Sequence, residues 1–187
     1  METTSDAVHV TTVASSGIAE QVLGDLLPIY EAVFAEHPYN EGPRDVADFL
    51  ERFQHERTAR GFRLAYAHVD GSMVGFAYGY LLESSTTWWG GFLDTKPDDA
   101  FTREDGHRTF VIMELAVMPD HRRRGLGREL HDVLVHGQAV ERFTLAVRPE
   151  AQPALFLYEG LGYELVGRTR PWDDAPTYCV AVRAASS

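Results

Sequence analysis

Apolar and polar residues alternate in three segments of the first half of the chain. Val8–Val13 is the first, and residues 62–69 and 73–82 flank the dipeptide Asp70-Gly71. Alternation with a period of two is typical of a strand with one face on a core, and Asp-Gly between two such runs favours a tight turn. The pattern predicts one early strand and, later, an antiparallel hairpin.

Two other segments repeat their apolar residues with the period of an α-helix. They are residues 18–34, which contain Pro28, and residues 45–60, which Gly61 follows. The inner face of the second segment consists of Val46, Phe49, Leu50 and Phe53. Because proline lacks a backbone N–H, we expect Pro28 to divide the first helix, whereas Gly61 is typical of a helix end.

The second half contains apolar strand segments at residues 110–117, 143–147 and 178–182. Between the first two, the chain runs Arg122-Arg-Arg-Gly-Leu-Gly-Arg128 and continues with apolar residues at helical spacing. The first backbone N–H groups of a helix lack intrahelical acceptors and carry partial positive charge, so anions bind there. Glycines let a ligand approach this backbone, and arginines add donors, which predicts a pyrophosphate site.

The kind of pyrophosphate ligand follows from what this turn lacks. No Gly-Lys-Ser/Thr follows, so it is not a Walker loop, and Gly-x-Gly-x-x-Gly is absent. CoA is therefore a better candidate than ATP or NAD. An ordinary strand-to-helix connection with solvated arginines is the alternative for the hexapeptide alone.

Two blocks of the sequence resemble the GNAT acyltransferase superfamily. Arg122-x-x-Gly125-x-Gly127 resembles its Arg/Gln-x-x-Gly-x-Gly/Ala signature. A later block resembles Asn-x-x-Ala-x-x-x-Tyr-Glu-x-Leu-Gly-Phe and matches at Ala154, Tyr158, Glu159, Leu161, Gly162 and the aromatic Tyr163. Ala151 stands in place of the asparagine, which puts one contact to the pantetheine arm in doubt. The blocks cover residues 108–170, about a third of the chain.

The resemblance implies an α/β fold in one domain. The expected sheet is mixed, mostly antiparallel and six- to seven-stranded, and about four helices flank it. The domain would span residues 8–183, between a disordered tail of residues 1–7 and a C-terminal tail of residues 184–187. Acetyl-CoA would be the cosubstrate, bound by Leu115, Ala116, Val117, Arg122, Arg123, Arg124, Gly125, Leu126, Gly127 and Arg128.

The chemistry that the resemblance implies is direct attack of a neutral amine on the acetyl thioester. An alkyl ammonium, with a pKa of about 10.4, must first lose a proton, and Glu114 is the candidate base. The alternative for Glu114 is a structural ion pair with a nearby arginine. Tyr158 occupies the position of a tyrosine that protonates the leaving thiolate in relatives.

The acceptor site is expected in the turn at residues 39–43 and in a long insert at residues 83–108. Long loops in compact domains are usually functional or disordered. Two tryptophans beside two glycines suggest a lid, and the acidic residues nearby would attract a cationic amine. The alternative is a solvated loop that the tryptophans anchor to the core. The expected acceptor-binding residues are Tyr39, Glu41, Glu83, Trp88 and Trp89.

Composition narrows the class of protein further. The chain has 187 residues, of which 44% are apolar, which suits one domain with a substantial core. Its formal charge of −11 argues against nucleic-acid binding, and no apolar run is long enough for a membrane span. Cys179 is the single cysteine, so no internal disulfide forms, and no zinc or other metal site is expected.

The remaining expectations concern the setting of the protein. The amino terminus lacks the features of a secretory signal, which predicts a cytoplasmic location. Lys96 is the only lysine, and this arginine bias is consistent with a bacterial source. A homodimer is left open.

The leading hypothesis is an acetyl-CoA-dependent N-acetyltransferase that acts on the primary amine of a small molecule. Acetylation of a protein N-terminus or lysine is the first alternative. A non-catalytic acyl-CoA-binding sensor is the second.

Overall fold

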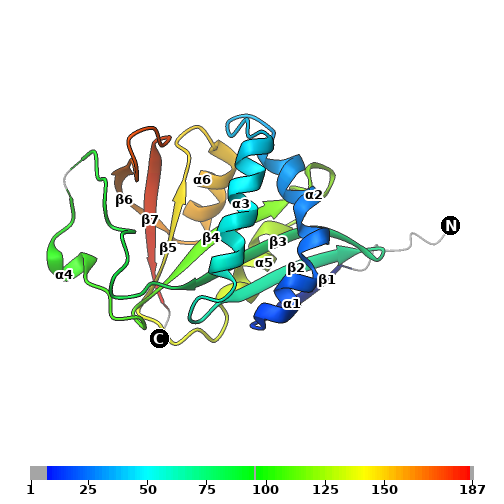
Figure 1. The fold of residues 1–187 in the computed structure, drawn as a ribbon, viewed down its shortest axis with the longest axis horizontal. Helices are drawn as coiled ribbons and strands as arrows, with labels where there is room; N and C mark the ends of the chain where they lie inside the picture. The colour runs from blue at the N-terminus through cyan, green and yellow to red at the C-terminus, as the bar shows by residue number, and fades with distance from the viewer. Residues whose placement is uncertain (1–7, 95, 186–187) are drawn as a thin grey trace.

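The computed structural model describes residues 8–94 and 96–185 as a seven-stranded sheet with helices on both faces (Figure 1). Residues 1–7, where a tail is expected, and residues 186–187 lie outside this description. The strands are β1 Val8–Val13, β2 Arg63–Val69, β3 Ser72–Leu81, β4 Thr109–Val117, β5 Arg142–Val147, β6 Glu164–Thr169 and β7 Tyr178–Ala184. The helices are α1 Ser16–Gln21, α2 Leu23–Phe34, α3 Pro43–Glu56, α4 Asp99–Thr102, α5 Leu126–Val135 and α6 Gln152–Gly160, with a 3-10 turn at Pro119–His121.

The strand order is β1-β2-β3-β4-β5-β7-β6, and only β4 and β5 run parallel. The predicted mixed, mostly antiparallel α/β fold is therefore confirmed. Asp70 and Gly71 form the two-residue hairpin turn, with φ angles of 51° and 80°. Positive φ at both central positions is the requirement of a type I′ turn, which is why Asp-Gly predicted this hairpin correctly.

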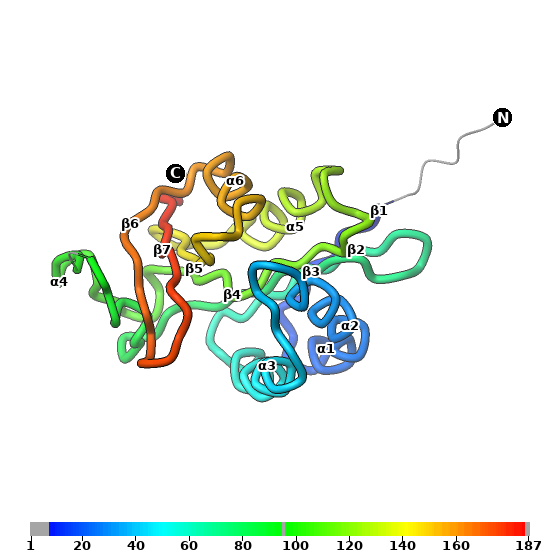
Figure 2. The backbone as a smooth tube through the Cα atoms, turned by 90° about the horizontal axis from the view of Figure 1, so that it is seen from above, coloured from blue at the N-terminus to red at the C-terminus, as the bar shows by residue number. Residues whose placement is uncertain are grey.

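Helices cover the two faces of the sheet as separate layers (Figure 2). α1, α2 and α3 lie on one face, where the largest fully buried side chains include Phe49, Phe53 and Tyr78. α5 and α6 lie on the other face, where Leu130 and Leu134 of α5 are fully buried. Both cores follow the apolar periodicity of the sequence, because each helix turns its apolar stripe toward the sheet.

The first predicted helix divides at a different residue than expected. The break between α1 and α2 falls at Val22, and Pro28 lies inside α2. Pro28 costs one intrahelical hydrogen bond in the second turn, where burial of Leu26, Ile29 and Tyr30 against the sheet offsets that loss. This division and the short α4 raise the helix count above the expected four.

β4 and β5 diverge at the centre of the sheet (Figure 1). They pair only from Thr109 to Ile112 of β4 and from Arg142 to Leu145 of β5. The β3–β4 register shifts between Tyr78 and Gly79, so β4 bends at this point. The second half of β4 stays paired with β3 and leaves β5, which opens the sheet on the β5 side of residues 113–117.

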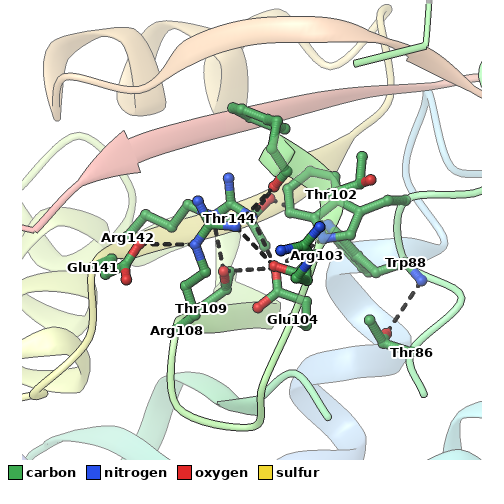
Figure 3. Close-up of polar contacts among 12 residues, drawn as sticks. Thr86, Trp88, Thr102, Arg103, Glu104, Arg108, Thr109, Glu141, Arg142 and Thr144 are labelled. Atoms are coloured by element: carbon green, nitrogen blue, oxygen red, sulfur yellow. Dashed lines mark hydrogen bonds and ion pairs between the residues drawn. The ribbon is translucent and has the colours of Figure 1, made fainter. Parts of the chain in front are cut away.

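The insert at residues 83–108 is fastened to the sheet through β4 and β5. Trp89 Nε1 donates to Glu104 Oε1 at 2.9 Å, and Arg142 Nη2 donates to the same oxygen at 2.8 Å. Figure 3 shows Glu104 and Arg142 joined by Thr109, whose hydroxyl lies 2.8 Å from each partner. Trp88 Nε1 donates to Thr144 Oγ1 at 3.2 Å. The tryptophans therefore anchor the insert to β5, the alternative to a lid.

Candidate active site

The turn before α5 presents a row of free backbone donors. Gly125 is the N-cap of α5 and has a φ of +85°, a left-handed conformation that favours glycine. Within the described part of the chain, none of the six consecutive backbone N–H groups of residues 123–128 has a hydrogen-bond acceptor. Six free amides around a helix N-terminus form the kind of concave donor set that binds a pyrophosphate.

Two arginine side chains of this turn, those of Arg122 and Arg128, make contacts within the protein. Arg122 Nε donates to Val117 O at 3.0 Å, and its Nη1 pairs with Glu36 Oε2 at 2.7 Å. Arg128 Nη2 donates to Gly160 O at 2.9 Å, which ties α5 to the end of α6. The expected cofactor turn therefore offers chiefly backbone donors to an anion, and Arg122 and Arg128 brace the backbone that carries them.

Gly127 fits this role for a steric reason. A Cβ added there would lie 3.3 Å from Leu157 Cδ2 and 3.7 Å from Leu115 Cδ2. The first turn of α5 thus packs closely against α6 and β4. This close packing brings the free amides to the opening between β4 and β5.

The predicted pantetheine segment, Leu115 to Val117, lies on the open side of β4. It pairs with β3 through Gly75, Phe76 and Ala77, and beyond Ile112 the strand has no pairing with β5. Its backbone groups on that side are available to a ligand strand. A pantetheine arm carries amide groups, so it can hydrogen-bond here as a neighbouring β-strand would.

Glu114 directly precedes this segment in β4, and its side chain faces α3. Arg52 Nη2 forms an ion pair with Glu114 Oε1, and the Glu114 side chain is 13% exposed. Burial raises the pKa of Glu114 to about 8, against the opposing effect of the Arg52 guanidinium, and Glu41 and Glu56 add to the rise. A carboxyl with this pKa can hold a proton or release it near neutral pH, as a general base requires. Both sequence hypotheses for Glu114 remain compatible with this geometry.

Tyrosines and carboxylates surround this ion pair. Tyr78 Oη donates to Glu56 Oε2 at 2.5 Å, and Tyr30 Oη donates to Glu41 Oε2 at 2.6 Å. Burial raises the pKa of Tyr78 and of Tyr30, and the charge of Glu114 raises each further. The site is therefore lined by neutral phenols and by carboxyl groups, with the Arg52 guanidinium among them.

Tyr158 reaches this group of residues from α6, on the other side of the opening. Burial raises the pKa of Tyr158, and the neighbouring Tyr39, Tyr163 and Glu114 raise it further. The ring packs edge-on against Tyr163, with centroids 5.8 Å apart. Among the residues that the structure describes, none accepts from or donates to the Tyr158 hydroxyl. The phenol is thus protonated and free to donate, as expected for an acid at the thiolate.

The expected acceptor residues separate into two groups. Tyr39 and Glu41 lie at the Glu114 site: burial and the charge of Glu114 raise the pKa of Tyr39 to about 12, and burial raises the pKa of Glu41. Glu83 lies instead beside Gly106, where a Cβ would be 3.3 Å from Glu83 Oε2. Trp88 and Trp89 hold the insert on the sheet. The structure therefore does not bring Glu83, Trp88 or Trp89 to Glu114.

Several residues of the site were missed by the sequence analysis. They are Tyr30, Arg52, Glu56, Tyr78 and Tyr178. Glu56 gave a signal, since it follows Phe49 by seven residues and Phe53 by three, which places a carboxylate on the apolar face of a helix. No pattern could find the tyrosines, which are brought together from α2, β3 and β7.

The fold and the site define a class of protein: an acyltransferase domain in which a diverging pair of parallel strands faces a helix N-terminus with free amides. The chain belongs to the acetyltransferase (GNAT) family, whose model matches residues 26–163. No curated protein matches the chain significantly.

Solved structures share the fold at low sequence identity. The ribosomal-protein-S18-alanine N-acetyltransferase from Escherichia coli has a TM-score of 0.63 and 18% identity, covering 97% of this chain and 96% of its own. An acetyltransferase from Thermus thermophilus has a TM-score of 0.61 and 16% identity, covering 96% and 97%. The yncA protein from Salmonella typhimurium, solved with its cofactor acetyl-CoA, has a TM-score of 0.62 and 13% identity, covering 97% and 95%.

The family and the free amides agree with the expectation of acetyl-CoA as cosubstrate. A search of the described residues finds no helix with the length and apolarity that crossing a membrane requires. Within residues 8–94 and 96–185, no three His, Cys, Asp or Glu side chains gather into a metal-binding group.

Proposed function

We propose that this protein transfers the acetyl group of acetyl-CoA to the primary amine of a small molecule. The observation that carries the proposal is the arrangement of Glu114 and Tyr158 on opposite sides of the opening between β4 and β5. The six free amides of residues 123–128 lie at the same opening. These positions support one site for the proposed base, acid and cofactor donors.

The steps follow from these positions. The pyrophosphate binds the amides before α5, and the pantetheine arm lies along Leu115 to Val117, which brings the thioester between Glu114 and Tyr158. Glu114 takes the proton of the acceptor ammonium, and the neutral amine attacks the thioester carbon. The tetrahedral intermediate then expels the CoA thiolate, which Tyr158 protonates, and the second proton that the nitrogen loses as the amide forms restores the Tyr158 phenol. Backbone N–H groups of β4 stabilise the charge on the thioester oxygen.

A small acceptor is favoured by how deeply the site lies below the surface. Glu114 is 13% exposed, and Tyr30 and Tyr78 beside it are 3% and 0% exposed, so the base lies below the surface. A compact amine needs only a narrow approach to a base at this depth, whereas a folded protein surface would need a broader one.

Two measurements test the proposal. Thermal stabilisation by acetyl-CoA reports binding, and release of free thiol across panels of small amines and of peptides with free N-termini or lysines reports turnover. We expect stabilisation and thiol release with a subset of the amines. Turnover on peptides alone would assign a protein substrate, and binding without turnover on either panel would assign a sensor.

A further inference from the structure

Arg52 is the charged residue of α3 that reaches the proposed base. Its Nη2 pairs with Glu114 Oε1, its Nε lies 3.5 Å from Glu56 Oε1, and its side chain is 41% exposed. Glu56 is in turn fixed by Tyr78, which lies opposite Glu114 in the β3–β4 register. A closed ring of contacts therefore runs from β3 through α3 to β4.

We propose that Arg52 is a positioning residue: it holds the Glu114 carboxylate at the opening between β4 and β5 and sets the pH range in which this carboxylate is ionised. The inference rests on the proposed function, because it assigns Glu114 the role of base. Arg52 lies outside both family motifs of the sequence, at residues 122–127 and 154–163.

Of the groups around Glu114, Arg52 is the one placed to stabilise its ionised form. The titratable and charged groups that face the site, taken element by element, are Tyr30 of α2, Tyr39 and Glu41 before α3, Arg52 and Glu56 of α3, Tyr78 of β3, Arg148 after β5, Tyr158 of α6 and Tyr178 of β7. Glu41 and Glu56 oppose ionisation of Glu114. Of the two arginines, Arg52 is the one paired with it.

This pairing has a consequence for the reaction. Loss of the guanidinium leaves the desolvation of Glu114 unopposed, so its carboxyl stays protonated to higher pH and cannot accept the ammonium proton. A residue that only fastened α3 to the sheet would lower the amount of folded enzyme. It would not move the pH dependence of the enzyme that remains.

The test compares pH profiles of kcat/KM for Arg52→Met, Arg52→Lys and the wild type, with one acceptor amine throughout. We expect Arg52→Met to move the midpoint to higher pH and to lower kcat/KM at pH 7 by about tenfold or more, since removing a nearby opposite charge shifts a carboxyl pKa by roughly 1–3 units. Arg52→Lys keeps the positive charge, so the midpoint of its pH profile should lie close to that of the wild type. The KM for acetyl-CoA should not change.

Arg57→Met is the matched control. Arg57 directly follows α3 and binds Ser16 and Glu20, away from Glu114. It should leave the midpoint unchanged, although it also loses an ion pair of this helix. An unchanged midpoint in Arg52→Met, or an equal shift in Arg57→Met, would overturn the inference.

A second readout separates this inference from the proposed function. Titration of 13C-labelled glutamate carboxyls by NMR follows Glu114 directly, with Glu114→Gln identifying its resonance. We expect the Glu114 midpoint to rise in Arg52→Met and not in Arg57→Met. A wild-type protein without turnover would contradict the proposed function, whereas an unmoved resonance would contradict the role of Arg52 even in an active enzyme.

Discussion

Burial raises the pKa of two side chains at the opening between β4 and β5, and the consequence for function differs between them. Burial favours the neutral form of an acid, so the pKa of Tyr158 and the pKa of Glu114 are both raised. For a phenol this keeps a donor protonated. For a carboxyl it produces a base that titrates near neutral pH. The same desolvation therefore prepares both partners of the proposed proton transfers.

Tyr158→Phe tests the acid. We expect kcat to fall by about a hundredfold, because the thiolate loses its proton donor, while acetyl-CoA affinity is nearly kept. Stopped-flow or steady-state thiol release and a cofactor titration measure the two effects. Tyr163→Phe is the control, because the Tyr163 hydroxyl lies 2.9 Å from buried His131 Nε2 and serves the packing of α5. Normal turnover by Tyr158→Phe would assign the proton to another donor.

The base predicts a direction of pH dependence. Glu114 must be ionised to accept a proton, and its pKa is raised to about 8, so kcat/KM should increase with pH up to this value. Below it, each pH unit should change the rate about tenfold, as the ionised fraction does. Glu114→Gln should lower kcat/KM and remove this inflection. A wild-type profile that is flat from pH 6 to 8 would contradict the assignment.

At the scale of elements, the function depends on where a helix starts and where two strands separate. α5 begins after its N-cap Gly125, with free amides on both sides of this residue, and β4 leaves β5 after Ile112. Each feature alone is common in α/β proteins. Their coincidence places the free amides of residues 123–128, the proposed anion site, at one end of the opening along which we propose that the ligand arm lies.

Gly125→Asp tests the anion site. A carboxylate at the N-cap would accept from the amides that a phosphate needs and would repel the phosphate, so acetyl-CoA affinity should fall by about a hundredfold or more. Calorimetric titration with acetyl-CoA measures this. Gly137→Asp matches the backbone strain, because Gly137 follows α5 with a φ of +69° and has open space at its Cβ, as Gly125 has. Equal loss of affinity in both variants would assign the effect to strain.

At the scale of the whole molecule, the insert completes the sheet. The Leu93 N–H of the insert donates to Arg168 O of β6, and the Arg170 N–H after β6 donates to Gly91 O of the insert. The insert therefore runs beside β6. The side chains of Glu104 and Arg142 are 1% and 7% exposed, and the Arg142 guanidinium packs against the rings of both Trp89 and Phe101, 4.8 and 4.4 Å from their centroids. A buried charge pair with several hydrogen bonds thus joins the insert to the centre of the fold.

Glu104→Gln should lower the free energy of unfolding by roughly 3 kcal/mol, since it leaves the buried Arg142 without its counterion. Chemical denaturation measures the change. Asp94→Asn is the control, because it removes an exposed ion pair of the same insert with Arg168 and should change stability little. Similar losses in the two variants would contradict a central role of the buried pair.

Sequence patterns predicted the parts of this protein that depend on neighbours along the chain. The Asp70-Gly71 hairpin, the apolar stripes of α3 and α5 and the turn at Gly125 are each fixed by local backbone preferences or by burial of one face. The family signature has the same local character, because a helix start needs only a short stretch of suitable residues. These elements could therefore be predicted from the order of the residues.

Tertiary structure alone decided the surroundings of Glu114 and the role of the insert. Arg52 is 62 residues from Glu114 in sequence, and Arg142 is 38 residues from Glu104. Charges at such separations meet only when strands and helices pack, and their pKa values then depend on the water that packing removes. The sequence thus determined the fold and the glycine turn before α5, whereas the packed structure determined which arginine faces the proposed base and that Trp88 and Trp89 serve as anchors.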